Sequence, residues 1–265
     1  MTLISLSYWD IAFAASLLVI NAALSIFLQL GVHRQLIISA VRMVVQLTLI
    51  GFVLLKLFAL VSPLWTAIAA IAMVSFAAYE IMSRQERRFQ GVWAFGLGAG
   101  PMLFAAGLVT VFSLTTQIGA DPWYHPRFAL PLFGMILGNT MTGISLGLNT
   151  LIANTLRERG AIEAQISLGY TRVEALGPVI RQAMRTGFIP IINAMAASGI
   201  VSLPGMMTGQ ILAGVAPGEA VKFQILIMFL IGGATGIGVT IAVLAGAYRL
   251  TDERHRLRLD RLKQV

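Results

Sequence analysis

Seven apolar segments follow one another along this sequence, and each is long enough to cross a lipid bilayer. A bilayer core about 30 Å thick needs about 20 apolar residues per spanning helix. An α-helix satisfies all its backbone hydrogen bonds within one segment, as lipid requires. The sequence therefore predicts an all-α, polytopic membrane helix bundle that forms a single domain over residues 1–265. The predicted transmembrane helices are residues 9–30, 36–58, 63–82, 92–117, 128–153, 187–213 and 221–248.

Composition agrees with lipid as the main solvent. Apolar residues make up 57% of the chain and charged residues 11%, against roughly 45–50% and 25% in soluble domains. The absence of cysteine excludes disulfides, thiolate metal sites and cysteine nucleophiles. The net charge of +8 does not indicate nucleic-acid binding, because the basic residues lie between and after the apolar segments, where they set topology.

The distribution of basic residues predicts the orientation. Fifteen of the 19 lysine and arginine residues fall in residues 31–35, 84–91 and 154–186 and in the tail 249–265. Only Lys56, Arg127 and Lys222 belong to the opposite side. Because positive charge is retained in the cytoplasm, the first set is expected inside and the amino terminus outside. An even number of helices would destroy this asymmetry, so seven is preferred over six or eight.

Pairs of glycines four residues apart recur in the apolar segments. In lipid this spacing lets helix backbones approach closely, so we expect the last three spans to form a tight bundle. The alternative is that glycine is simply frequent in membrane helices, which could account for about half of the pairs. The pairs are Gly96 and Gly100, Gly134 and Gly138, Gly143 and Gly147, Gly205 and Gly209, and Gly232 and Gly236.

The longest connection, residues 154–186, has the pattern of an amphipathic helical element. Apolar residues recur every three or four positions, with a break expected at Gly169. Pro178 is expected to limit the helix that follows. Such an element could lie on anionic lipid as an interfacial helix. The other interpretation is a docking helix for a cytoplasmic partner.

One motif in this connection resembles the coupling loop of ABC transporter permeases. Glu163, Ala164 and Gln165, followed by Gly169, are similar to the E-A-A-x-x-x-G signature of the short helix that fits a groove on the ATP-binding subunit. The motif lies just before the last two predicted spans. The stretch 179–182 departs from the pattern, because it reads Val-Ile-Arg-Gln where the permease pattern has an apolar residue and Leu-Pro.

A second motif resembles the Fet-type iron-export permease family. The run from Gly199 to Gly214 contains Leu203-Pro204-Gly205-Met206-Met207, and residues 134–141 and 42–46 resemble other parts of the same pattern. The likeness covers nearly the whole chain. One departure concerns the span before this run, which has Asn193 and Ala196 where the family carries an acidic residue and a lysine.

The resemblance implies a homodimeric permease subunit that exports a substrate, such as iron or another metal, and works with a separate cytoplasmic ATPase in the bacterial inner membrane. ATP and Mg²⁺ would then bind to the partner, with no cofactor on this chain. The residues agree, because none of the three lysines lies in a G-x-x-x-x-G-K-[ST] phosphate-binding loop. The alternative function is an ATPase-independent secondary transporter or channel, although we find no convincing internal repeat.

Arg42 is the basic residue predicted inside a span, where an arginine near mid-helix costs about 2.5–3.5 kcal/mol. We expect either an ion pair with Glu80 or snorkelling of Arg42 to the headgroups. Pro204 and Gly205 should interrupt the sixth apolar segment, and broken helices in transporters line protein or water-filled cavities. This break is the best pointer to a translocation path.

Other polar and flexible residues in the spans could line the path or serve helix packing. Methionine prefers copper(I) to iron(II), and here it more often indicates packing than metal binding. No His, Asp or Glu cluster suited to iron is visible in the spans. The candidate path or packing residues are Arg42, Gln46, Asn139, Thr140, Asn193, Leu203, Pro204, Gly205, Met206, Met207 and Gln210.

Overall fold

The computed structural model describes residues 7–264, which belong to two compact units, Met1–Leu60 and Val61–Val265. Among these residues, six helices are long and apolar enough to cross a membrane. The chain is therefore an all-α, polytopic helix bundle, as the apolar segments predict. The predicted span 187–213 is not among these six helices. The number of crossings and the orientation therefore stay predictions.

The first unit is a pair of helices, α1 (Tyr8–Phe27) and α2 (His33–Leu60). Ser7 starts α1 with a capping box, in which its hydroxyl accepts the Trp9 N–H at 3.1 Å and Asp10 accepts the Ser7 N–H at 2.8 Å. Within this unit nearly all side chains are exposed. Apolar exposure of this kind fits a surrounding of lipid or partner helices and not water.

The second unit contains the hydrophobic core. Pro63, Pro126 and Pro217 each open a helix at its first turn, where the missing N–H costs no hydrogen bond. Its helices are α3 (Pro63–Ser83), α4 (Val92–Ser113), η1 (Leu114–Ile118), α5 (Pro126–Arg157), α6 (Arg159–Ser167), α7 (Arg172–Ala197), α8 (Gly205–Leu212), α9 (Pro217–Arg249) and η2 (Leu259–Arg261).

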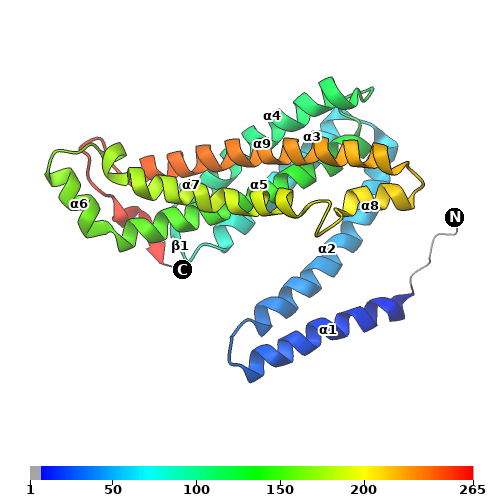
Figure 1. Ribbon diagram of the computed structural model, residues 1–265, viewed down its shortest axis with the longest axis horizontal. Coiled ribbons are helices and arrows are strands. Elements are labelled where there is room, and N and C mark those ends of the chain that lie inside the picture. The colour runs from blue at the N-terminus through cyan, green and yellow to red at the C-terminus, as the bar shows by residue number, and fades with distance from the viewer. Residues whose placement is uncertain (1–6, 265) are drawn as a thin grey trace. The chain divides into compact units, whose positions relative to one another are not determined.

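Helices α5, α7 and α9 run side by side at the centre of this unit (Figure 1). Ile136, Ile144, Leu148 and Leu151 of α5 are fully buried in this packing. The close bundle expected for the last three spans is therefore confirmed. Only some of the glycine pairs lie in helix contacts. Gly143 and Gly147 lie in this contact, whereas a Cβ on Gly96 or Gly100 would meet nothing within 4 Å.

The predicted span 187–213 differs most from the structure. Helix α7 begins much earlier and continues through Pro178 and Pro190 to Ala197. The expectation that Pro178 limits this helix is wrong, because Ala175, Leu176 and Val179 are buried and their packing holds the helix across the proline. The expected interruption is confirmed: residues 198–204 are not helical and α8 begins at Gly205.

The tail folds back onto the connection between α3 and α4. Strand β2 (Leu262–Gln264) pairs antiparallel with β1 (Arg87–Phe89), and Lys263 lies opposite Arg88. Gln90 strengthens this contact, since its Nε2 donates to the Asp260 carbonyl at 2.9 Å. The connection 84–91 and the tail, which were predicted to share one side of the membrane, therefore lie together.

Candidate functional site: the α6–α7 hairpin

Two capped helix ends form the turn between α6 and α7. Gly169 adopts φ +95°, and the N–H groups of Gly169 and Tyr170 donate to the carbonyls of Ile166 and Gln165 at 3.0 and 3.1 Å. These are the two bonds of a Schellman motif, which needs a left-handed residue at this position. The break predicted at Gly169 is therefore confirmed, and its cause is a specific turn.

Helix α7 begins with a capping box. The Thr171 hydroxyl and the Glu174 carboxylate each accept a backbone N–H from the other residue. The hydrogen bond from the Thr171 N–H, followed by that from its hydroxyl, lowers the pKa of Glu174. The box thus fixes the direction in which α7 leaves the turn.

The turn presents apolar side chains to solvent. Leu168, Tyr170 and Val173 are 78%, 53% and 67% exposed, whereas Ile162 on α6 and Leu176 on α7 are buried and anchor the hairpin. We call Leu168, Tyr170 and Val173 the apolar tip. Three exposed apolar side chains on a rigid turn are typical of a surface that binds another protein.

The predicted coupling residues lie beside the apolar tip. Glu163 and Ala164 are exposed, Gln165 is half-buried, and Gly169 forms the turn itself. The Glu163 carboxylate accepts the Arg159 Nε–H at 2.8 Å, an i, i+4 pair that holds its charge on the outer face of α6. Sequence reasoning missed the apolar tip, because the exposure of Leu168 and Tyr170 depends on how α6 packs on α7.

The carboxyl-terminal tail holds the start of α7, a contact that no sequence pattern predicted. The Arg172 N–H donates to His255 Nδ1 at 3.1 Å, and Arg172 Nη1 donates to the Asp252 carbonyl at 3.1 Å. The Arg172 guanidinium also lies 4.6 Å from the centroid of the Tyr248 ring. These contacts fix the hairpin to the end of α9.

Asp252 organises the tail at this contact. Its carboxylate accepts the backbone N–H groups of Arg254 and Arg256 at 3.0 and 2.9 Å and pairs with the Arg256 guanidinium. The hydrogen bond from the Arg256 N–H is the main reason that the pKa of Asp252 lies below its usual value. The ionised carboxylate therefore stabilises the turn that positions His255.

The candidate path residues of the second unit separate into buried and exposed groups. Thr140 is fully buried against α9, where its Cγ2 would lie 2.6 Å from a Cβ on Gly238. Asn139 on α5 and Asn193 on α7, in contrast, are exposed, and Asn139 Nδ2 donates to the Met135 carbonyl at 2.8 Å. Thr140 therefore lies in the α5–α9 contact and the two asparagines face outward, while the choice between packing and path stays a prediction for all three.

The broken-helix region combines exposed and buried candidates. Leu203 and Gly205 are exposed, whereas Pro204 and Met206 are half-buried and Met207 is buried. Gln210 on α8 has a buried Oε1 that has no hydrogen-bond partner among the described atoms. An unpaired buried amide oxygen beside a helix break is consistent with a polar path there, and the role of these residues stays a prediction.

The ion pair expected for Arg42 and the role of the methionines both remain untested. Arg42 and Gln46 lie one turn apart on α2 of the first unit, whereas Glu80 lies on α3 of the second, so the ion pair between Arg42 and Glu80 stays a prediction. Metal binding by methionine gains no support, because Met206, Met135 and Met141 pack against the core. Within residues 7–264, no group of three or more His, Asp or Glu side chains could hold a metal ion.

The fold defines a class, that of multi-pass membrane helix bundles with an exposed hairpin at one end. Sequence comparisons give the family, since the model of the uncharacterised protein family UPF0014 matches residues 8–251. The chain belongs to this family. No solved structure matches it.

Relatives share most of their length with this chain. A UPF0014 membrane protein of Synechocystis is 36% identical over 96% of this chain and 97% of its own. The probable iron export permease protein FetB of Escherichia coli is 29% identical, with 96% of each chain covered. The protein ALUMINUM SENSITIVE 3 of Arabidopsis thaliana is 31% identical over 87% of this chain and 84% of its own.

Proposed function

We propose that this chain is the membrane-spanning subunit of an ABC-type exporter and that a separate cytoplasmic ATPase docks on the α6–α7 hairpin. The apolar tip carries the proposal. Leu168, Tyr170 and Val173 are exposed on a turn that two capped helices hold rigid. An apolar tip of this kind fills a groove on a partner better than it faces water. The E-A-Q-x-x-x-G motif occupies the same turn.

Helix α7 supplies a route from the docking surface into the membrane. Its 26 residues span about 39 Å at 1.5 Å per residue. It begins at the apolar tip and packs against α5 and α9 through Gly187. Because this helix is continuous from the tip to Gly187, we expect a displacement of the tip to reach the bundle contact.

The same proposal includes seven crossings, with the amino terminus outside and the tail inside. The pairing of β1 with β2 supports it, because both strands must then lie on one side of the membrane. Along the chain from β1 to β2, helices α4, α5 and α9 cross the membrane three times. Three crossings would leave the two strands on opposite sides of the membrane. If α7 and α8 together make a fourth crossing, the strands lie on the same side and can pair. Four charged residues lower the hydropathy of α7 without preventing this, because they lie before its last twelve residues: Arg172, Glu174, Arg181 and Arg185.

We propose further that two copies form the transporter and that the path lies between them. Asn139 and Asn193 support this arrangement because polar amides on the outer face of membrane helices are costly against lipid. A second copy or a water-filled path would accommodate them. Iron is the first substrate to test, because the E. coli relative is named a probable iron export permease.

The proposal is tested by co-expressing this chain with a candidate ABC ATPase from the same genome and measuring whether the two co-purify. Leu168→Gln should abolish or strongly reduce recovery of the ATPase, whereas Leu212→Gln should not. Leu212, at the end of α8, is a matched control because it is 74% exposed and lies away from the hairpin. Equal recovery with both variants would refute docking at the tip. Iron efflux from cells that lack the ATPase would instead support a secondary transporter or channel.

A further inference from the structure

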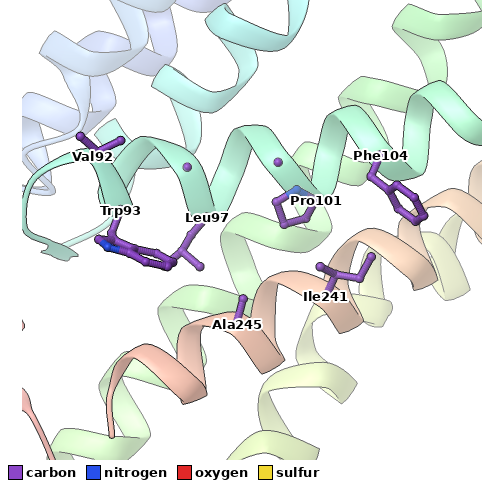
Figure 2. A pocket seen from close by; sticks show the side chains of 9 residues that line it. Val92, Trp93, Leu97, Pro101, Phe104, Ile241 and Ala245 are labelled. Carbon is purple, nitrogen blue, oxygen red and sulfur yellow. The ribbon is translucent and has the colours of Figure 1, made fainter. Parts of the chain in front are cut away.

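An apolar groove runs along the outer face of the second unit between α4 and α9. Its volume is about 570 Å³. Trp93, Leu97 and Phe104 of α4 point toward the groove, with Ile241 and Ala245 of α9 on its other side (Figure 2). Gly96 and Gly100 also line the groove, and a Cβ on either glycine would meet nothing within 4 Å.

The length of the groove matches one leaflet of a bilayer. From Val92 to Phe104 helix α4 rises about 18 Å, and half of the hydrocarbon core is about 15 Å thick. Every lining side chain is apolar apart from the indole N–H of Trp93. A single acyl chain therefore fits the groove in length and in polarity.

A positive charge lies at one end of the groove. The Arg249 guanidinium lies 4.9 Å from the centroid of the Trp93 ring. Its Nε is buried and has no hydrogen-bond partner among the described atoms. The neighbouring carboxylates are engaged elsewhere in the described tail, since Asp252 pairs with Arg256 and Asp260 pairs with Arg258. The Arg249 Nε–H therefore has no acceptor among the described atoms, and the described tail pairs both carboxylates with other arginines.

Further basic residues surround this end. Arg88 and Lys263 line a second hollow, of about 650 Å³, beside the start of α4. Tryptophan and arginine together at the end of a membrane helix are typical of the headgroup level. Clustered basic residues at that level attract anionic headgroups.

We propose that the groove between α4 and α9 binds one acyl chain of an anionic glycerophospholipid and that Arg249 binds its phosphate. The lipid belongs to the leaflet on the side of β1 and the tail. The proposal requires only that the chain lies in a membrane, so it stands or falls separately from ATPase docking.

The test is native mass spectrometry of the full chain, purified in detergent and mixed with equal amounts of dioleoyl phosphatidylglycerol and dioleoyl phosphatidylcholine. The wild type should retain phosphatidylglycerol in preference. Gly100→Leu fills the groove and should lower the retention of both lipids about tenfold, since several CH₂ contacts are lost. Arg249→Gln should lower only the preference for phosphatidylglycerol, by roughly fivefold.

Matched controls separate the site from general effects. Gly107→Leu adds the same side chain to α4 at a glycine that also has nothing within 4 Å but does not line the groove. Arg254→Gln removes the same charge from the exposed tail. Both should bind lipid as the wild type does. If Gly100→Leu fails to fold, Arg249→Gln decides alone.

Two outcomes would overturn the proposal. The first is unchanged retention of phosphatidylglycerol in both Gly100→Leu and Arg249→Gln. The second is conversion of dimers to monomers by Gly100→Leu with lipid binding intact, which would make the groove an interface between copies of the chain.

Discussion

Gly143 of α5 and Gly187 of α7 approach so closely that a Cβ added to either would lie 2.9 Å from the carbonyl oxygen of the other. Val239 of α9 closes the same contact, since its methyl groups would lie 2.9 Å from a Cβ on Gly143 and 2.6 Å from one on Gly187. Three helices therefore meet at a point where two of them have no side chain. In lipid, where no hydrophobic force drives helices together, such contact provides much of the association energy.

This contact predicts a large effect from a single methyl group. Gly187→Ala should destabilise the bundle by about 1–3 kcal/mol, because the backbone or Val239 must move to admit it. Gly138→Ala on α5 is the control, since its Cβ would meet nothing within 4 Å. Thermal unfolding in detergent measures both. Combining Gly187→Ala with Val239→Ala should recover part of the lost stability. Equal unfolding temperatures for Gly187→Ala and the control Gly138→Ala would contradict the packing.

The turn at Gly169 predicts a conformational effect without a steric one. A Cβ at this position has free space, but φ +95° is unfavourable for any L side chain. Gly169→Ala should therefore cost about 1–2 kcal/mol in the turn and reduce stimulation of the partner ATPase. Gly169→Asn should retain more stimulation, because asparagine tolerates left-handed conformations better than alanine. An Asn variant no better than the Ala variant would argue against the backbone explanation.

The β1–β2 pairing predicts a disulfide. The chain contains no cysteine, so Arg88→Cys combined with Lys263→Cys introduces the only thiols. These residues are direct partners across antiparallel strands, where Cβ atoms lie about 4.5–5.5 Å apart. Mild oxidation should cross-link them, and a mobility shift after proteolysis between the strands reports it.

The control for this cross-link is Arg87→Cys with Lys263→Cys, which shifts the register by one residue and directs the side chains to opposite faces. It should cross-link poorly. Comparable yields from the two pairs would mean that the tail does not form this strand.

Acid should loosen the contact between the tail and α7. The folded state lowers the pKa of Asp252 through the hydrogen bond from the Arg256 N–H, so the ionised form stabilises this turn. That contribution is complete above the unfolded pKa, about 3.9, and is lost as the pH falls through the lower folded value. The Arg254 and Arg256 amides should therefore lose protection against hydrogen exchange only below about pH 4, after correction for intrinsic exchange rates.

The variant Asp252→Asn tests the cause. In this variant the Arg254 and Arg256 amides should exchange faster at pH 7 than in the wild type. Because asparagine does not titrate, lowering the pH should not accelerate their exchange further. Equal exchange rates for Asp252→Asn and the wild type at pH 7 would exclude the proposed role of the carboxylate.

Apolar segment length predicted six of the membrane helices to within a few residues. The exception is the predicted span 187–213, where the sequence pattern does not show how long the helix is. Arg181 and Arg185 interrupt the apolar pattern of α7, yet the helix continues because its packing against α5 and α9 decides its length. The pairing of Phe89 with Leu262 was also invisible, since three-residue strands far apart in the chain carry too little pattern.

For the hairpin, the sequence predicted the position of the turn and the coupling motif but not the surface that they form. Gly169 signalled a helix end because only a few residues adopt left-handed φ readily. The exposure of Leu168 and Tyr170 depends on how α6 packs on α7, which follows from tertiary contacts and not from periodicity.

Cross-linking from the apolar tip tests the central claim most directly. In this cysteine-free chain, Leu168→Cys carries a single thiol that a short thiol-to-amine reagent can link to a neighbouring protein. We predict that Leu168→Cys captures the co-expressed ABC ATPase, that added ATP changes the yield, and that Leu212→Cys captures none. Equal capture from both positions, or none from Leu168→Cys in a complex that still hydrolyses ATP, would contradict docking of the ATPase on the α6–α7 hairpin.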